Sequence, residues 1–188
     1  MKNLGFFLII AGLAFACSSD DEGTPQPQPV EFSTYINSGG AAIGGTDWVA
    51  DKDFTDGTIY PAAGPVTAEI ANTDNDALYQ IERNSKDFPN GFSYEIDVPA
   101  NGPWDVELHF AEIFHEAAGA RIFDVSIEGQ LVLDDYDIFA EAGAKNTAIV
   151  ETFSDVDIQD GNVTIEFTNG SADNAKISGI GVSGSYLP

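Results

Sequence analysis

The sequence predicts an all-β protein built as an antiparallel β-sandwich. From Glu31 onward, apolar and polar residues alternate with a period of two, which is the spacing of a strand with one buried face. Turn-forming residues such as Asn-Gly and Asp-Gly separate these runs at intervals of about 8–15 residues. Short alternating strands joined by frequent turns are typical of a sandwich.

Four alternating runs are the main predicted strands. In one of them Trp104, Val106, Leu108 and Phe110 fall on a single face, and the residues between them are mostly polar. The four runs cover residues 92–98, 104–111, 122–127 and 162–167, and turns are predicted at 89–91, 101–103, 128–129, 160–161 and 169–170. One short helix is predicted, at residues 138–144.

Length and charge limit the classes of function. The chain has 188 residues, which is room for one domain of ordinary size, placed at 31–188. Seven Lys and Arg residues against 31 Asp and Glu residues give a net charge of −24. Such a field repels phosphate backbones and anionic lipid surfaces, so nucleic acid is excluded as a partner. Neutral glycans and cations remain possible ligands.

The first 16 residues are predicted to be a signal peptide. Lys2 is followed by an apolar run at 4–16, which is too short to span a bilayer as a helix. The run ends directly before Cys17, the only cysteine in the chain, which also excludes an intramolecular disulfide. We therefore expect cleavage before Cys17 and lipidation of its thiol, although Leu13 stands one place earlier than in the usual lipoprotein motif. An ordinary secretory signal is the alternative. Cleavage removes Lys2 and changes the net charge from −24 to −25.

Residues 17–30 are predicted to be the lipidated cysteine and a tether. The acidic run at 18–22 resembles the export signals of Bacteroidota surface lipoproteins, and the alternating prolines at 25–29 favour an extended polyproline II spacer. We expect an outer-membrane lipoprotein exposed at the cell surface, in contact with the membrane only through its lipid anchor. A periplasmic orientation, with the acidic run as a solvated spacer, is the alternative.

Four ordered sequence blocks resemble the malectin family. They are YINSGG at 35–40, LYQIER at 78–83, LHFAEIFH at 108–115 followed by RIFDVSIEG at 121–129, and DNAKI at 173–177. The resemblance spans about residues 34–183. It implies a jelly-roll sandwich of the galactose-binding type and a non-catalytic carbohydrate-binding function. The implied ligand is a neutral oligosaccharide or glucan, possibly one that contains glucose.

The resemblance also implies a set of sugar-binding residues. Phe114 and His115 match two adjacent aromatic positions of the family, Asp173 matches a ligand-binding aspartate, and Trp48 and Tyr60 lie near further binding aromatics. Aromatic faces stack on the C–H surface of a sugar ring, and a few polar groups orient its hydroxyls. Continued strand alternation would instead place Phe114 in the core, and Trp48 would be a core residue in many sandwiches.

Two departures from the family pattern support an alternative function. Phe114 lacks a phenol hydroxyl, and His115 replaces a plain aromatic ring. A structural or protein-interaction module that has lost sugar binding is therefore the second hypothesis. In the 78–83 block, Glu82 and Arg83 are expected to form a buried ion pair between strands, and ligand contact by Tyr79, Glu82 and Arg83 is the alternative.

No catalytic motif is apparent. The chain has no Gly-x-Ser-x-Gly nucleophile motif, and 31 acidic residues nominate no particular glycosidase pair. No cofactor is expected. The oxygen-rich runs at 51–57 and 72–76 leave a structural calcium ion as a possibility, although turn-forming Asp and Asn residues explain both.

Overall fold

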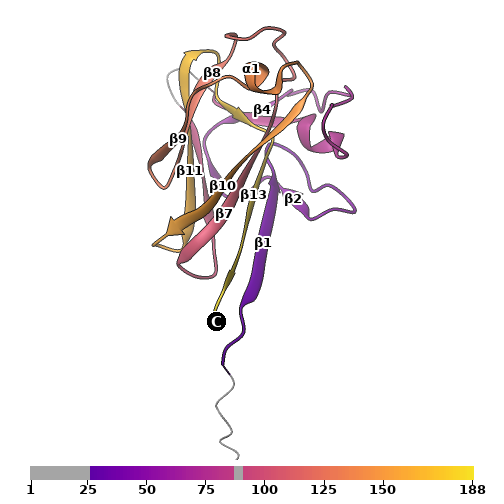
Figure 1. Ribbon diagram of the computed structural model, residues 1–188. Coiled ribbons are helices and arrows are strands. Elements are labelled where there is room, and N and C mark those ends of the chain that lie inside the picture. Colours follow the sequence, from indigo (N-terminus) through magenta and orange to yellow (C-terminus); the bar gives the residue numbers. More distant parts are fainter. Residues whose placement is uncertain (1–25, 87–90) are drawn as a thin grey trace, which may run out of the picture.

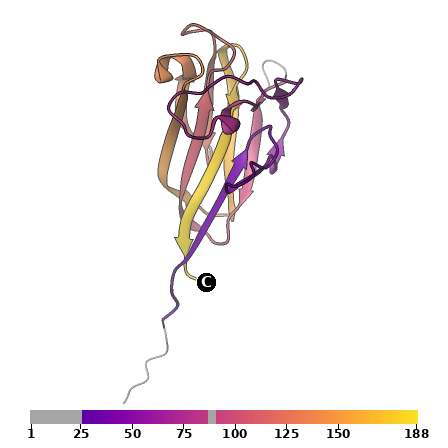
Figure 2. The same ribbon diagram turned by 90° about the vertical axis from the view of Figure 1, so that its right-hand side faces the viewer.

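The computed structural model describes residues 26–86 and 91–188, and it is an all-β sandwich as predicted. The predicted signal peptide, the lipidation site at Cys17 and the tether up to residue 25 lie outside these residues. Figures 1 and 2 show two sheets packed face to face. In the described ranges no helix has the length and apolar character needed to cross a membrane.

The first sheet has the strand order β10-β7-β13-β1-β2 and the second has the order β3-β6-β11-β8-β9. All pairings are antiparallel except that of β1 with β2. The first sheet comprises β1 (Val30–Asn37), β2 (Trp48–Ala50), β7 (Gly102–Ala111), β10 (Ala148–Ile158) and β13 (Gly179–Tyr186). The second comprises β3 (Phe54–Thr55), β6 (Phe92–Asp97), β8 (Ile122–Ile127), β9 (Gln130–Tyr136) and β11 (Asn162–Ala172).

A small third sheet, of order β12-β5-β4, lies at the upper end of the sandwich in Figure 1. Its strands are β4 (Thr58–Tyr60), β5 (Glu82–Asn84) and β12 (Lys176–Ile177). The α-helix predicted at 138–144 is present as α1 (Ile138–Ala142), and a 3-10 turn, η1, covers Asp76–Tyr79. The side chain of Asp137 caps α1 by accepting a hydrogen bond from the Ala140 N–H, and Gly143 ends it in the left-handed conformation.

The core confirms the predicted alternation. The side chains of Trp104, Val106, Leu108 and Phe110 on β7 are all buried, and they face the buried residues of the second sheet. Each strand thus contributes every second residue to one shared core. A second, smaller core cluster lies beneath the third sheet and η1 and includes Ile70, Leu78, Tyr79, Ala111, Ile113 and Ala148. Residues 26–188 contain both clusters.

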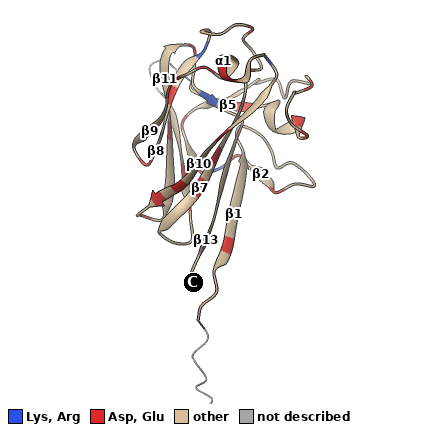
Figure 3. Ribbon diagram, viewed as in Figure 1, with Lys and Arg blue, Asp and Glu red and all other residues tan. Residues whose placement is uncertain are grey.

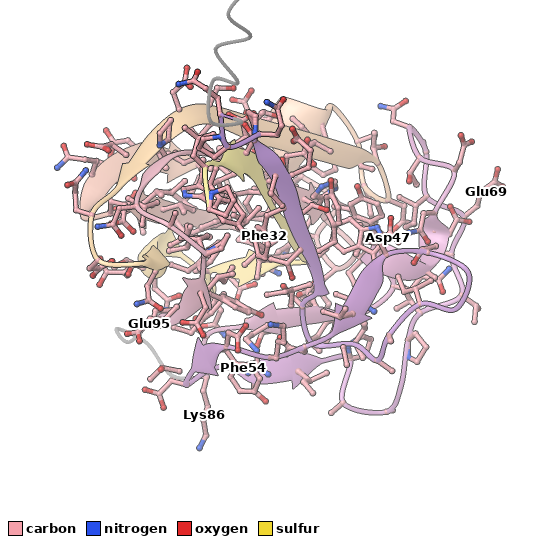
Figure 4. All side chains as sticks on the ribbon, turned by 90° about the horizontal axis from the view of Figure 1, so that it is seen from below. Phe32, Asp47, Phe54, Glu69, Lys86 and Glu95 are labelled. Atoms are coloured by element: carbon pink, nitrogen blue, oxygen red, sulfur yellow. The ribbon has the colours of Figure 1, made fainter. Side chains whose placement is uncertain are left out.

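Charged residues are distributed unevenly over the sandwich. Acidic residues occur on many elements, whereas the few Lys and Arg residues lie mainly in the upper half of Figure 3. Seen from below, Phe54, Lys86 and Glu95 lie along one edge (Figure 4). The Phe54 ring covers the guanidinium of Arg83, whose carbon lies 3.3 Å from the ring centroid, a cation–π contact.

Candidate functional site

A pocket of about 160 Å³ lies where three chain segments meet at the upper end of the sandwich. The segments are the third sheet, the loop at 112–121 between β7 and β8, and the turn that precedes β12. The pocket is lined by Tyr60, Glu82, Asn84, Phe114, Arg121, Asp173 and Asn174. β1 begins, and the chain ends, at the opposite end of the molecule (Figure 1).

Two aromatic rings form one wall of the pocket. Tyr60 and Phe114 meet edge to face, with ring centroids 5.8 Å apart, and Phe114 contacts His115 in the same geometry at 4.9 Å. The alternative that Phe114 belongs to the core is wrong, because 54% of its surface is exposed. β7 ends at Ala111, so the strand alternation does not continue to Phe114.

Asp173 supplies a carboxylate at the rim. Its Oδ2 lies 2.6 Å from His115 Nε2 and 3.2 Å from an Arg121 terminal nitrogen. The backbone at Asp173 adopts a positive φ of 51°, a conformation that aspartate tolerates better than most residues. The structure therefore brings Tyr60, Phe114, His115 and Asp173 together, four of the five residues predicted for the sugar site.

Buried Glu112 holds the aromatic loop in place. Its Oε1 accepts hydrogen bonds from the N–H groups of Phe114 and His115, at 2.8 and 3.0 Å. Its Oε2 accepts a 2.7 Å bond from Arg121 Nε. Burial alone would raise the pKa of Glu112, but the charges of Lys176 and Arg121 and these hydrogen bonds lower it to about 2.

This shift makes the stability contributed by Glu112 depend on pH. The folded-state pKa of about 2 lies below the ordinary glutamate value of 4.5, so ionised Glu112 stabilises the fold above pH 4.5 and this stability is lost as the pH falls toward 2. The full shift corresponds to about 3 kcal/mol. We expect the difference in unfolding free energy between wild type and Glu112→Gln to shrink between pH 6 and pH 3. Urea unfolding curves measure this difference, and a constant value would contradict the assignment.

Glu82 and Lys176 form a second, fully buried ion pair beside the pocket. Burial raises the pKa of Glu82, against the opposing charges of Lys176 and Arg121. The expected Glu82–Arg83 pair is wrong, because neighbouring residues of β5 point to opposite faces. Arg83 instead donates 2.9 and 2.5 Å hydrogen bonds to Asp51 Oδ2.

Trp48 lies outside the pocket. Its ring packs edge-on against His109, at 4.9 Å between centroids, and at 5.4 Å from Tyr35. It lines a separate open groove between β1 and the loop at 42–47. Trp48 was grouped with the pocket residues because it lies near a binding aromatic of the family in the sequence, and a loop of uncertain length separates it from the matched blocks.

The first oxygen-rich run has a structural role in the fold. Asp51, which opens the run at 51–57, uses both carboxylate oxygens, one for Arg83 and one for the hydroxyl of Tyr94 at 2.8 Å. In the second run, Asp76 accepts a hydrogen bond from the N–H of Ile70. Within residues 26–86 and 91–188, no three His, Cys, Asp or Glu side chains gather as metal ligands.

Sequence reasoning missed several pocket residues. Arg121, Asn84 and Asn174 line the pocket and were not nominated, and neither was Glu112, which holds the aromatic loop; Glu112, Arg121 and Asn174 all lie inside matched blocks. One available signal was the position of Arg121, one of only seven Lys and Arg residues, directly before an alternating apolar strand. Asn84 carried no signal beyond its place next to the 78–83 block.

Comparison with known proteins adds a decisive observation. The family model described as "Malectin domain" matches residues 32–184, most of the chain. The chain belongs to the malectin family. Human malectin is 28% identical over 186 residues, covering 88% of this chain and 60% of its own length. Malectin-A of Xenopus laevis is 30% identical over 119 residues, covering 57% of this chain and 42% of its own. The chain thus spans about half the length of these malectins.

Solved structures agree on the fold. The extracellular domain of ANXUR2 from Arabidopsis thaliana matches with a TM-score of 0.69 at 16% identity, over 82% of this chain and 49% of that one. A beta-glucuronidase of Bacteroides uniformis matches with a TM-score of 0.62 at 21% identity, over 80% of this chain and 18% of that one. At these identities the likeness concerns the fold alone. Membership of the malectin family supports the predicted class of function, a carbohydrate-binding module.

Proposed function

We propose that this malectin domain is a non-catalytic module that binds a neutral, glucose-containing oligosaccharide in the pocket at 60, 82, 84, 114, 121 and 173–174. The observation that carries the proposal is the partly exposed Tyr60–Phe114 wall beside a floor and rim of polar side chains. This combination suits a sugar ring, which has apolar C–H faces and a hydroxylated edge.

The size of the pocket suits one sugar ring. Its volume of about 160 Å³ is close to that of an engineered protein cavity of about 150 Å³ that takes up one benzene molecule, so the pocket has room for no more than one sugar ring. A longer glycan would extend outward across the exposed Phe114 ring. The net charge of −24 disfavours anionic glycans.

The charges in the pocket favour binding over catalysis. A glycosidase needs two carboxyl groups free to act on the glycosidic bond. Here Glu82 is paired with Lys176, and Asp173 lies against His115 and Arg121. We expect no release of reducing sugar from any polysaccharide that the protein binds, and sustained release would contradict the non-catalytic assignment.

A glycan array tests the binding proposal. Residues 26–188, which contain both core clusters, would be applied to an array rich in α- and β-linked glucans. We expect selective binding to glucose-containing oligosaccharides and none to sulfated or uronic-acid glycans. A folded domain that binds no glycan would overturn the proposal.

One contact favours a protein-interaction module as the second candidate. The Nε2 atom of His115 lies 2.6 Å from Oδ2 of Asp173, the carboxylate that the family resemblance assigns to ligand binding. If this pair does not open, the aromatic wall would serve a protein partner instead. That outcome would appear as a glycan-negative array together with partner binding that Phe114→Ala weakens.

We also propose that a lipid anchor at Cys17 displays the module on the outer membrane, with the cell surface as its location. The support from the fold is that β1 begins at the end of the sandwich opposite the pocket (Figure 1), so an anchor there would leave the pocket facing away from the membrane. Cys17→Ser is expected to abolish incorporation of labelled palmitate and to move the protein from the membrane to the soluble fraction. Unchanged labelling would contradict this assignment.

A further inference from the structure

Two buried oxygen atoms on the pocket floor have no hydrogen-bond partner among the described residues. They are Glu82 Oε1 and Asn84 Oδ1, and both residues line the pocket. Buried polar atoms in native proteins are almost always paired with protein, water or ligand. Two neighbouring unpaired acceptors in one pocket indicate that a bound ligand supplies their hydrogen-bond donors.

The strand register explains why both side chains face the pocket. Glu82 and Asn84 are two residues apart on β5 and therefore lie on one face. Tyr60 on β4, which forms part of the aromatic wall, is directly opposite Glu82, and Lys176 on β12 is directly opposite Asn84. Paired residues of antiparallel strands share a face, so the third sheet presents Tyr60, Glu82 and Asn84 together.

The nearby donors are already engaged. Lys176 Nζ pairs with Glu82 Oε2 and donates to the carbonyl oxygen of Ala111 at 2.5 Å. The Arg121 guanidinium donates to Glu112 and to the carbonyl of Asn174, and it also pairs with Asp173. Neither cation is directed at Glu82 Oε1 or Asn84 Oδ1.

We propose that Glu82 and Asn84 are specificity-determining residues that accept hydrogen bonds from two hydroxyl groups of the bound sugar. This inference rests on the proposed sugar-binding function. It means that the pocket selects a sugar ring whose hydroxyl groups facing Glu82 and Asn84 carry no substituent. On binding, the sugar hydroxyls supply the donors that these oxygens lack among the described residues.

The pocket should therefore reject a sugar that lacks one of these hydroxyls. A deoxy analogue leaves a buried acceptor unpaired, and an O-methyl analogue removes the same hydroxyl donor. Sites built to pair with a hydroxyl discriminate strongly against analogues that lack it. We expect at least one monodeoxy position to reduce affinity about tenfold or more.

The test uses methyl α-D-glucoside and its 2-, 3-, 4- and 6-deoxy analogues as probes, with affinities from NMR titration of residues 26–188. The measured quantity is the ratio of the affinity for the parent glucoside to that for each analogue. In Asn84→Leu, which has similar volume and no acceptor, the ratio at one position should fall to within about twofold of unity. Asn84→Asp, which keeps an acceptor oxygen, should preserve the discrimination.

The outcomes separate this inference from the function on which it rests. If the wild type binds none of the five glucosides, the glucose-binding function fails and the inference fails with it. If the wild type binds all five equally, only the inference is overturned. If Asn84→Leu weakens parent and analogues by the same factor, Asn84 has a purely structural role and its assignment is wrong.

Discussion

Replacing Lys176 by methionine is expected to lower the free energy of unfolding by about 3–5 kcal/mol, because it leaves a buried carboxylate without its partner. Both members of the Lys176–Glu82 pair are fully buried. The same substitution removes the hydrogen bond from Lys176 to the carbonyl of Ala111. Methionine has a similar length, so the loss reflects the missing charge and donor. Urea unfolding at pH 7 measures it.

Lys145→Met is the matched control. Lys145 pairs with Glu116 at 3.2 Å in a solvent-exposed position, and exposed ion pairs contribute about 0–1 kcal/mol. We expect this variant to unfold within about 1 kcal/mol of the wild type. Equal effects of the two substitutions would show that the buried pair does not hold the third sheet in place.

Replacing Phe114 by alanine is expected to reduce glycan affinity at least about tenfold, equivalent to about 1.4 kcal/mol or more of binding free energy. Phe114 forms the exposed half of the aromatic wall, so the variant loses the stacking surface. The fold should remain intact, because the ring covers little of either core cluster. Calorimetric titration with the glycan selected on the array measures the loss.

Leu131→Ala provides the comparison for a general surface effect. Leu131 is 55% exposed, close to the 54% of Phe114, and lies on β9 outside the pocket. We expect its glycan affinity to equal that of the wild type. If both variants lose affinity to the same extent, or neither does, the aromatic wall is not the binding surface.

The strands could be predicted from the sequence because strand burial is a local property. Alternation in 92–98, 104–111, 122–127 and 162–167 identified the buried faces of β6, β7, β8 and β11. The short helix predicted at 138–144 is present as α1. The family blocks at 35–40 and 78–83 also meet in space, since a Cβ added at Gly39 would lie 2.5 Å from the Glu82 carbonyl oxygen.

The partners of charged residues could not be predicted in the same way. Glu82 is paired with Lys176 and Arg83 with Asp51, and both partners are far away in the sequence. The pairing of β12 with β5 brings Lys176 close to Glu82, whereas Asp51 reaches Arg83 from the loop after β2. The same long-range convergence placed Asn84 and Arg121 in the pocket and left Trp48 outside it.

The most direct test of the central claim is an NMR titration of residues 26–188 with the glycan selected on the array. We predict that the largest chemical-shift changes fall on Tyr60, Asn84, Phe114 and Asp173, and that the Trp48 indole signal is unaffected. Changes centred on Tyr35 and Trp48, with the pocket signals unmoved, would contradict the account and assign glycan binding to the groove beside β1.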